Sequence, residues 1–176
     1  FKAGLTAEPQ MRRFNATSPA GAPLFKGGLI EVLDSSKPIR LKPFKGMMLE
    51  TELAFKTAQP ITEALKDESA LKALIATVHP AVEVPQLFFA DMGKVDFFEI
   101  VASAIGSKIF LAGGSFSLAE VDPDTVKVRL TLNGDVVNEG AATDALDGQW
   151  KALLWLVNSM LERGYKIEAG QYLLTG

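Results

Sequence analysis

The residues best suited to chemistry are three glutamates in apolar segments. Glu50 and Glu52 are separated by one residue in MLETELAF, and Glu83 lies in AVEVPQLFF. Successive side chains of a strand point to opposite faces, so Glu50 and Glu52 are expected on one face, where their charges repel unless something lies between them. Carboxylates without cysteine fit a hard divalent cation such as Mg²⁺. The pattern alone favours the alternative that both glutamates lie on the solvated face of an edge strand, because charged side chains are mostly exposed.

Two further residues are candidates for proton transfer, and each has a simpler structural explanation. His79 is the only histidine and precedes Pro80, so it is expected at the exposed end of a helix. Lys2, in the opening FKAGLT, is equally well explained as a solvated terminal lysine. The pair Gly113-Gly114 lacks the rest of a phosphate-binding loop.

The composition excludes several classes of protein. The 176 residues, 48% hydrophobic and 22% charged, are enough for one soluble domain with a real core. A net charge of −3 argues against a nucleic-acid surface, and no apolar run reaches the length of a membrane span. The absence of cysteine removes disulfides, thiolate nucleophiles and cysteine-ligated metal sites.

The three glutamates are expected to lie on strands. Alternation in MMLETELAFKT predicts a strand over 47–57, and AVEVPQLFF predicts a second strand over 81–89. Between them, apolar residues at helical spacing predict a helix over 62–78, which His79-Pro80 ends.

The other segments predict a mixed fold. Asn133-Gly134 joins two alternating runs and is the signature of a type I′ hairpin over 126–142. The amphipathic segment 148–164 predicts a helix with Gly164 as its C-cap. Because no regular βαβ repeat is present, the expected class is α+β with a sheet-rich core. Also predicted are strands over 27–33, 108–114 and 167–176, a helix over 95–107, and mostly loop over 1–26 and 34–46.

The spacing of the glutamates resembles that of a known family. Glu50-Thr51-Glu52, followed 31 residues later by Glu83, resembles the E-x-E…E metal triad of the 2-keto-4-pentenoate hydratase and 4-oxalocrotonate decarboxylase group, in the fumarylacetoacetate hydrolase superfamily. FKAGLT is similar to the family's K-x-G-L-T, and PAGAPLF stands where the family has P-D-F-G-x-L-F. LNGDVVNEGAATDAL and the stretch from KALLWL to AGQYLLTG are similar to the family's C-terminal segments.

The resemblance implies a fold and a reaction. The fold would be a mixed β-roll or barrel-like sheet with flanking helices, similar to the C-terminal domain of fumarylacetoacetate hydrolase. Glu50, Glu52 and Glu83 would hold Mg²⁺ or Mn²⁺, which would chelate the 2-oxo group and carboxylate of a small acid. Lys2 matches the family's active-site lysine, which would stabilise an enolate or transfer a proton. The expected activity is that of a metal-dependent lyase, a hydratase or decarboxylase of small 2-oxo or 2-hydroxydienoic acids from aromatic-compound degradation.

Several family positions are changed in this chain. The acidic residue of P-D-F-G falls on Ala20, and the arginine before E-x-E falls on Met48. The family's active-site serine aligns near Gly106, with Ser107 adjacent as the catalytic candidate. The P-L-N of the C-terminal helix reads Gln149-Trp150-Lys151.

These changes leave alternatives open. His79 is the candidate for a different proton carrier, since it lies four residues before Glu83. The activity could be that of a superfamily C–C hydrolase or keto–enol isomerase. The protein could also be a non-catalytic homologue that acts as a binding or scaffold partner of a true enzyme.

The resemblance runs the length of the chain, so residues 1–176 are expected to form a single hydratase/decarboxylase-like domain. The family has a helical region before K-x-G-L-T and a strand after L-T-G, and this domain is expected to lack both. Exposed strand edges would then need a partner. A cytoplasmic homo-oligomer is expected, alternatively in complex with a related decarboxylase or hydratase, with neither nucleic acid nor membrane as a partner.

Overall fold

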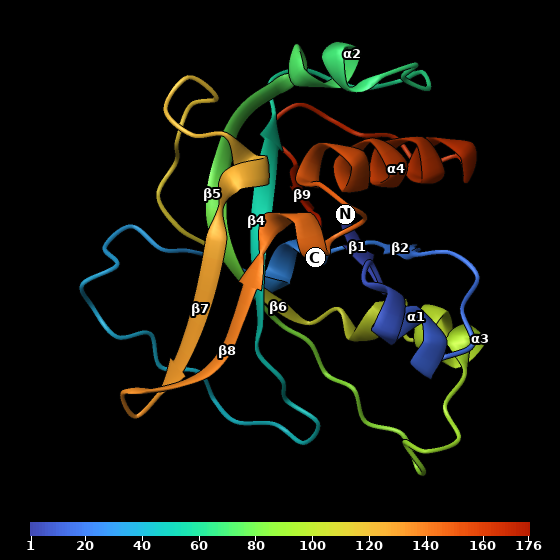
Figure 1. Cartoon of the computed structure of the whole chain (residues 1–176), viewed down its shortest axis with the longest axis vertical. Helices are drawn as coiled ribbons and strands as arrows, with labels where there is room; N and C mark the ends of the chain where they lie inside the picture. The colour runs from blue at the N-terminus through green and yellow to red at the C-terminus, as the bar shows by residue number, and fades with distance from the viewer.

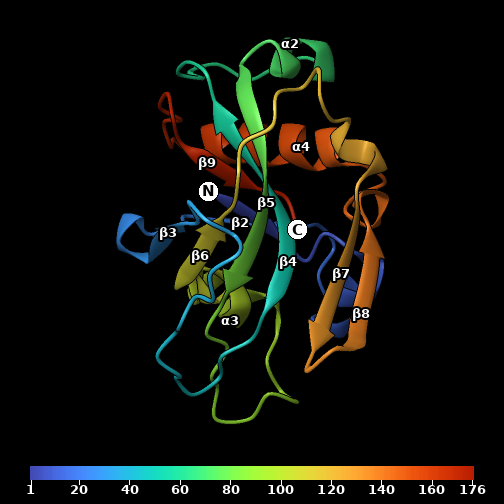
Figure 2. The same ribbon diagram turned by 90° about the vertical axis from the view of Figure 1, so that its left-hand side faces the viewer.

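A seven-stranded mixed sheet forms the centre of the molecule and curls into a half-barrel (Figures 1 and 2). The computed structural model describes all residues, 1–176. Neighbouring strands are antiparallel except for the parallel pairs β1–β9 and β3–β6. In spatial order the strands are β2 (Ala20–Ala22), β1 (Lys2–Gly4), β9 (Tyr172–Leu174), β4 (Glu50–Thr57), β5 (Ile75–Val84), β6 (Ile109–Ala112) and β3 (Leu29–Glu31).

The longest helix, α4 (Gln149–Glu162), covers one face of the sheet (Figure 1). It ends as predicted at Gly164, which has φ +81°. The Gly164 N–H donates to the Leu161 carbonyl and the Tyr165 N–H to the Met160 carbonyl, which is the Schellman pattern. The main core lies between this helix and the sheet, and its central members are Leu53, Phe55, Trp150, Leu153, Leu156, Val157, Met160 and Leu173.

Three short helices surround the rest of the sheet. α2 (Glu68–Lys72) lies beyond one end of β5, while α1 (Glu8–Arg13) and α3 (Phe97–Ala102) lie near the other end of the molecule (Figure 1). A second apolar cluster forms around α1, α3 and β2, with Leu5, Phe14, Ala20, Ala22, Val95, Ile100 and Ile105 buried. Single 3₁₀ turns are η1 (Lys26–Gly28), η2 (Ala104–Gly106), η3 (Pro123–Thr125) and η4 (Ala142–Asp144).

The predicted hairpin is present as a separate two-stranded sheet. β7 (Lys127–Leu132) and β8 (Asp135–Ala141) pair in antiparallel fashion and stand beside β4 (Figure 2). Asn133 and Gly134 have φ of +53° and +97°, as a type I′ turn requires. The α+β class with flanking helices is thus confirmed.

The prediction of a helix over 62–78 is wrong. Only the five residues of α2 are helical, and the chain is extended from Ile75. The reason is tertiary: β5 pairs with both β4 and β6, so its β-branched residues and Pro80 lie inside the sheet instead of ending a helix.

Smaller differences concern other boundaries. The segment 1–26, expected as mostly loop, contains β1, α1 and β2. The strand expected to reach residue 89 ends at Val84, and the helix expected to reach residue 107 ends at Ala102. None of the helices is both long enough and apolar enough to cross a membrane.

Candidate metal centre

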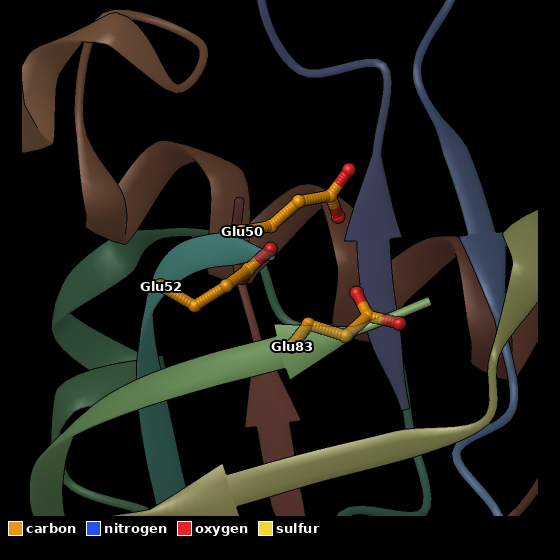
Figure 3. Close-up of side chains that lie close together, drawn as sticks. All are labelled: Glu50, Glu52 and Glu83. Atoms are coloured by element: carbon orange, nitrogen blue, oxygen red, sulfur yellow. The ribbon is translucent and has the colours of Figure 1, made fainter. Parts of the chain in front are cut away.

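The register of β4 and β5 brings the three glutamates together. Glu50 lies directly opposite Glu83, and Glu52 is two residues further along the same face of β4. One carboxylate oxygen from each residue lies within 4.8 Å of the others (Figure 3). Like charges directly opposite each other destabilise a strand pair, so this cluster needs a compensating positive charge.

The cluster is buried in the middle of the sheet. Glu83 is 1% exposed and Glu52 is 5% exposed, while Glu50 is partly buried. β4 is paired on one side with β9 and on the other with β5. The alternative of a solvated edge strand is therefore wrong.

Lys2 supplies one positive charge from β1. Its Nζ forms an ion pair with Glu83 Oε1 and donates a hydrogen bond of 2.8 Å to the carbonyl oxygen of Ile105. The side chain is 1% exposed, so the alternative of a solvated terminal lysine is also wrong. The predicted lysine and the three predicted ligands form one site.

The backbone of η2 lies close to that of β1 beside Lys2. Ile105 has φ +53° and ψ +36°, a left-handed conformation that is rare for a β-branched residue and costs about 1–3 kcal/mol. A Cβ on Gly4 would lie 2.9 Å from Ile105 Cγ2. Glycine at position 4 thus lets η2 approach β1, which brings the Ile105 carbonyl to the Lys2 ammonium group.

Burial changes the acidity of all three carboxyl groups. Desolvation raises the pKa of Glu83 to about 7, although Lys2 acts in the opposite direction. Desolvation, together with the charges of Glu83 and Glu50, raises the pKa of Glu52 well above its ordinary value. Desolvation also raises the pKa of Glu50. Without a cation the cluster therefore retains protons near neutral pH, and a bound divalent cation would favour the ionised form.

A hydrogen-bonded chain fixes Glu52 from the C-terminal side. The Gly176 N–H donates to Glu52 Oε2 at 2.6 Å. The preceding residue, Thr175, bonds through its hydroxyl to the Gln149 side-chain oxygen, and Gln149 Nε2 donates to the Ala142 carbonyl at 2.9 Å. Gln149, at a changed family position, therefore links the start of α4 to the segment that orients Glu52.

A cavity of about 290 Å³ adjoins the carboxylates. Lys2, Glu50 and Glu52 line it, whereas Glu83, which is paired with Lys2, is not part of its lining. Exposed polar residues of α1 and of the hairpin, Gln10, Arg13 and Asn138, also line it. Its apolar lining includes Leu5, Phe14, Leu87, Met92, Ile100 and Ile105.

The structure does not bring His79 to this site. His79 lies in β5, four residues from Glu83, which is about 13 Å along a strand. Its ring nitrogens lie 2.9 Å from Thr77 Oγ1 and 2.9 Å from the Gly113 carbonyl, and its ring packs edge-on against Tyr172. The expected place at an exposed helix end is wrong, because His79 is 5% exposed within the sheet.

Ser107 is also outside the cavity lining. Its Oγ is buried and has no hydrogen-bond partner. The neighbouring Gly106 has φ +67°, and a Cβ there would lie 2.8 Å from the Gln86 carbonyl oxygen. This backbone does not accept a serine at position 106. Of the other changed positions, Ala20 is buried in apolar surroundings and Met48 lines the cavity.

Sequence patterns missed several groups that contact the site. The Ile105 carbonyl and the Gly176 N–H are backbone groups. Every residue has such groups, so the residue type does not indicate which of them contact the site. Arg13 and Gln10 were missed because 1–26 was expected to be loop, whereas α1 places both at the cavity.

The donor set fits a hard divalent cation. All three donors are carboxylate oxygens, which Mg²⁺ and Mn²⁺ prefer. The three oxygens lie near enough to one another for a single ion to contact all of them. Three protein ligands would leave further positions for water or a chelating substrate.

The half-barrel sheet and its carboxylate triad define a fumarylacetoacetate-hydrolase-like fold with a metal centre. Among solved structures, the 4-oxalocrotonate decarboxylase of Pseudomonas putida G7, complexed with magnesium and adipate, matches with a TM-score of 0.83 and 31% identity over 99% of this chain and 65% of that chain. The fumarylpyruvate hydrolase of Pseudomonas aeruginosa, in complex with Mn²⁺ and pyruvate, shares the fold with a TM-score of 0.71 at 12% identity, over 99% of this chain and 75% of that one.

Curated relatives match the chain over its whole length. A 4-oxalocrotonate decarboxylase of Pseudomonas sp. (strain CF600) is 30% identical over 185 residues, which cover 100% of this chain and 66% of the relative. A 2-keto-4-pentenoate hydratase of Paraburkholderia phymatum is 26% identical over 176 residues, covering 99% of this chain and 66% of the relative. No family model matches. Along its whole length the chain is similar to 4-oxalocrotonate decarboxylases and 2-keto-4-pentenoate hydratases, and it spans just under two thirds of the length of these relatives.

Proposed function

We propose that the protein is a divalent-metal-dependent lyase, a hydratase or decarboxylase that acts on a small 2-oxo or 2-hydroxydienoic acid of aromatic-compound degradation. The observation that carries this proposal is the cluster of Glu50, Glu52 and Glu83 beside Lys2 at a small cavity. The names of the curated relatives support a lyase of this kind.

Glu50, Glu52 and Glu83 would hold Mg²⁺ or Mn²⁺. When bound, such an ion supplies Lewis-acid stabilisation of the negative charge that develops on a 2-oxo group. Gly176 orients Glu52 through its N–H, and Lys2 fixes Glu83 through the ion pair. These contacts hold Glu52 and Glu83 in place, which reduces the cost of ordering these two side chains on binding.

Lys2 is the residue proposed to act on the substrate. An ammonium group has three N–H donors, and Glu83 and the Ile105 carbonyl occupy two of them. The third is available to an enolate or carboxylate oxygen in the cavity that Lys2 lines. Apolar side chains form part of the cavity lining, and a hydrogen bond beside them is stronger than one in open water. Because His79 and Ser107 do not reach the cavity, neither is given a catalytic role in this proposal.

The proposed assembly is a cytoplasmic homo-oligomer in which residues 1–176 form one domain, alone or with a related decarboxylase or hydratase. Exposed apolar side chains of Leu33, Phe98 and Leu132 support contacts with another chain. Analytical ultracentrifugation of the whole protein tests this, because a monomer at micromolar concentration contradicts it.

Calorimetric titration with Mg²⁺ or Mn²⁺ and oxalate, a mimic of the 2-oxo acid, tests the function. Oxalate is expected to bind only with metal present, and Glu83→Gln is expected to abolish this binding. Glu162→Gln is the matched control, because Glu162 is an exposed carboxylate of α4 outside the site. Absence of metal binding by the wild type would exclude the proposed enzyme.

Absorbance assays then separate the reactions. Water addition to 2-hydroxypenta-2,4-dienoate identifies a hydratase, and loss of CO₂ from 2-oxohex-3-enedioate identifies a decarboxylase. Metal-dependent oxalate binding with neither activity would contradict the lyase and favour the superfamily hydrolase, the isomerase or the non-catalytic scaffold.

A further inference from the structure

We infer that Arg13, together with Gln10, binds a second carboxylate of the substrate, so that the preferred substrate is a dicarboxylic 2-oxo acid. This inference rests on the proposed function, because it takes the 2-oxo end of the substrate to lie at the three glutamates. It adds a specificity-determining residue from α1 that sequence patterns did not indicate.

Arg13 has no partner within the protein. In α1, Glu8 and Arg12 are four residues apart and form an ion pair on the helix surface. Arg13 is the next residue and therefore points in another direction, where no carboxylate meets it. Its guanidinium lies 5.3 Å from the centroid of the Phe14 ring, and Phe14 itself lines the cavity. The ring holds the guanidinium beside the cavity without using its N–H donors.

The charges of the cavity single out Arg13. Among the lining residues only Lys2, Arg13, Glu50 and Glu52 are charged. Lys2 is already paired with Glu83, which leaves Arg13 as the one cation of the lining without a carboxylate. A guanidinium binds a carboxylate through two parallel hydrogen bonds, a geometry that an ammonium group does not offer.

The lining changes in character from the buried end to the open end. Lys2 and Glu52 are almost fully buried, whereas Gln10, Arg13 and Asn138 are exposed. Apolar side chains such as Leu87 and Ile100 form the rest of the lining. A substrate held at the glutamates by its 2-oxo acid end would place a hydrocarbon chain against this apolar lining and its far end near Arg13 and Gln10.

This arrangement favours a far end that is a carboxylate. A methyl or vinyl end gains nothing from Arg13, whereas a carboxylate gains a charge-assisted pair of hydrogen bonds, to which the Gln10 amide can add. An ion pair stabilises the carboxylate itself and does not promote its loss as CO₂. Affinity, and not turnover, is therefore the quantity that reports on Arg13.

The test compares 2-oxohexanedioate with 2-oxohexanoate by calorimetry in the presence of Mg²⁺. The two acids have the same chain length and differ only in the second carboxylate. The wild type is expected to bind the diacid about tenfold more tightly, the usual size of a partly exposed charge-assisted contact. Arg13→Gln is expected to remove this preference without changing the affinity for 2-oxohexanoate, while the control Arg12→Gln keeps it.

The possible outcomes separate this inference from the proposed function. Equal Mg²⁺-dependent affinity of the wild type for the two acids overturns the role of Arg13 and leaves the proposed function standing. A diacid preference that survives in Arg13→Gln overturns it as well. Absence of Mg²⁺-dependent binding of both acids overturns the proposed function, and the inference with it. Circular dichroism of each variant establishes that α1 substitutions leave the fold intact.

Discussion

Two buried carboxylates, Glu52 and Glu83, and a partly buried one, Glu50, lie close together at the centre of this molecule, and Lys2 forms an ion pair with Glu83. If Glu50, Glu52 and Glu83 were all ionised, Lys2 would balance only one charge, and burying the others without a partner is costly. Burial raises the pKa of Glu83 to about 7 and raises that of Glu52 well above its ordinary value, so these carboxyl groups keep protons. A divalent cation would offset the charges without protons, so metal binding and proton release are linked.

The pH dependence of stability follows from this linkage. In the metal-free protein the raised pKa of Glu83 means that the folded state binds more protons than the unfolded state between pH 4.5, the ordinary value, and about 7. The stabilisation that protonated Glu83 gives the folded state is therefore fully present below pH 4.5. It is lost as pH rises through about 7. Urea unfolding without metal at pH 5 and pH 8 is expected to show lower stability at pH 8.

A control variant and added metal make the pH prediction specific. Glu83→Gln cannot ionise, so its stability is expected to fall less between pH 5 and pH 8. Saturating Mg²⁺ is expected to offset the loss at pH 8, because the ion binds the ionised carboxylates. A metal-free wild type that becomes more stable from pH 5 to pH 8 would contradict the buried, protonated state of the cluster.

At the scale of elements, the site depends on four segments meeting at one face of the sheet. β4 and β5 supply the glutamates, β1 supplies Lys2, and η2 supplies the carbonyl that holds the lysine. β1 and η2 pack so tightly that a Cβ on Gly4 would lie 2.9 Å from Ile105 Cγ2. The position of Lys2 therefore depends on a glycine.

Gly4→Ala is expected to lower the free energy of unfolding by about 1–3 kcal/mol, since its Cβ would overlap the buried Ile105 side chain. The same substitution is expected to weaken Mg²⁺-dependent oxalate binding, because η2 must move away from Lys2. Gly27→Ala is the matched control, since a Cβ at Gly27 would meet nothing within 4 Å. Urea denaturation and calorimetry measure both effects, and equal behaviour of the two variants would contradict a tight β1–η2 contact.

Local signals predicted some of these elements and failed for others. The strand of Glu50 and Glu52, the Asn133-Gly134 hairpin and the cap at Gly164 are set by alternation and turn chemistry, which the sequence displays directly. The strand β5 was mistaken for a helix up to Val78, because helical spacing of its apolar residues is overridden by pairing with two neighbouring strands. β1 and β2 have three residues each, too few for any period to appear.

The same limits apply to the site. The resemblance correctly placed Lys2 next to the three glutamates, a grouping that the structure now supports by geometry. His79 is close to Glu83 in sequence, which favoured a place near the carboxylates. Both residues lie in the extended strand β5, however, so four residues separate His79 from Glu83 along the strand. Arg13 could be found only after α1 was known, since its lack of a partner depends on helical spacing.

At the scale of the whole molecule, the candidate metal centre joins segments that are far apart in the sequence. Lys2 comes from the beginning, Gly176 from the end, and the glutamates from the middle, where β4 and β5 form the longest strand pair of the sheet. None of the three proposed ligands lies on a loop, since Glu50 and Glu52 belong to β4 and Glu83 belongs to β5. Loss of the metal site therefore requires disruption of the central sheet.

Metal binding is accordingly expected to stabilise the protein against global unfolding. A ligand that binds only the folded state at 100 times its Kd raises the free energy of unfolding by about 2.7 kcal/mol. Urea titrations of the wild type with and without Mg²⁺ at that concentration, at pH 8, are expected to differ by this amount, and Glu83→Gln is expected to show no difference. The amide protons of β4 and β5 should gain the same protection in hydrogen exchange, because these strands open only in global unfolding. Bound Mg²⁺ that left both the urea midpoint and this protection unchanged would contradict the prediction, because it would mean that the ion binds the folded and unfolded states equally and does not need the assembled glutamates.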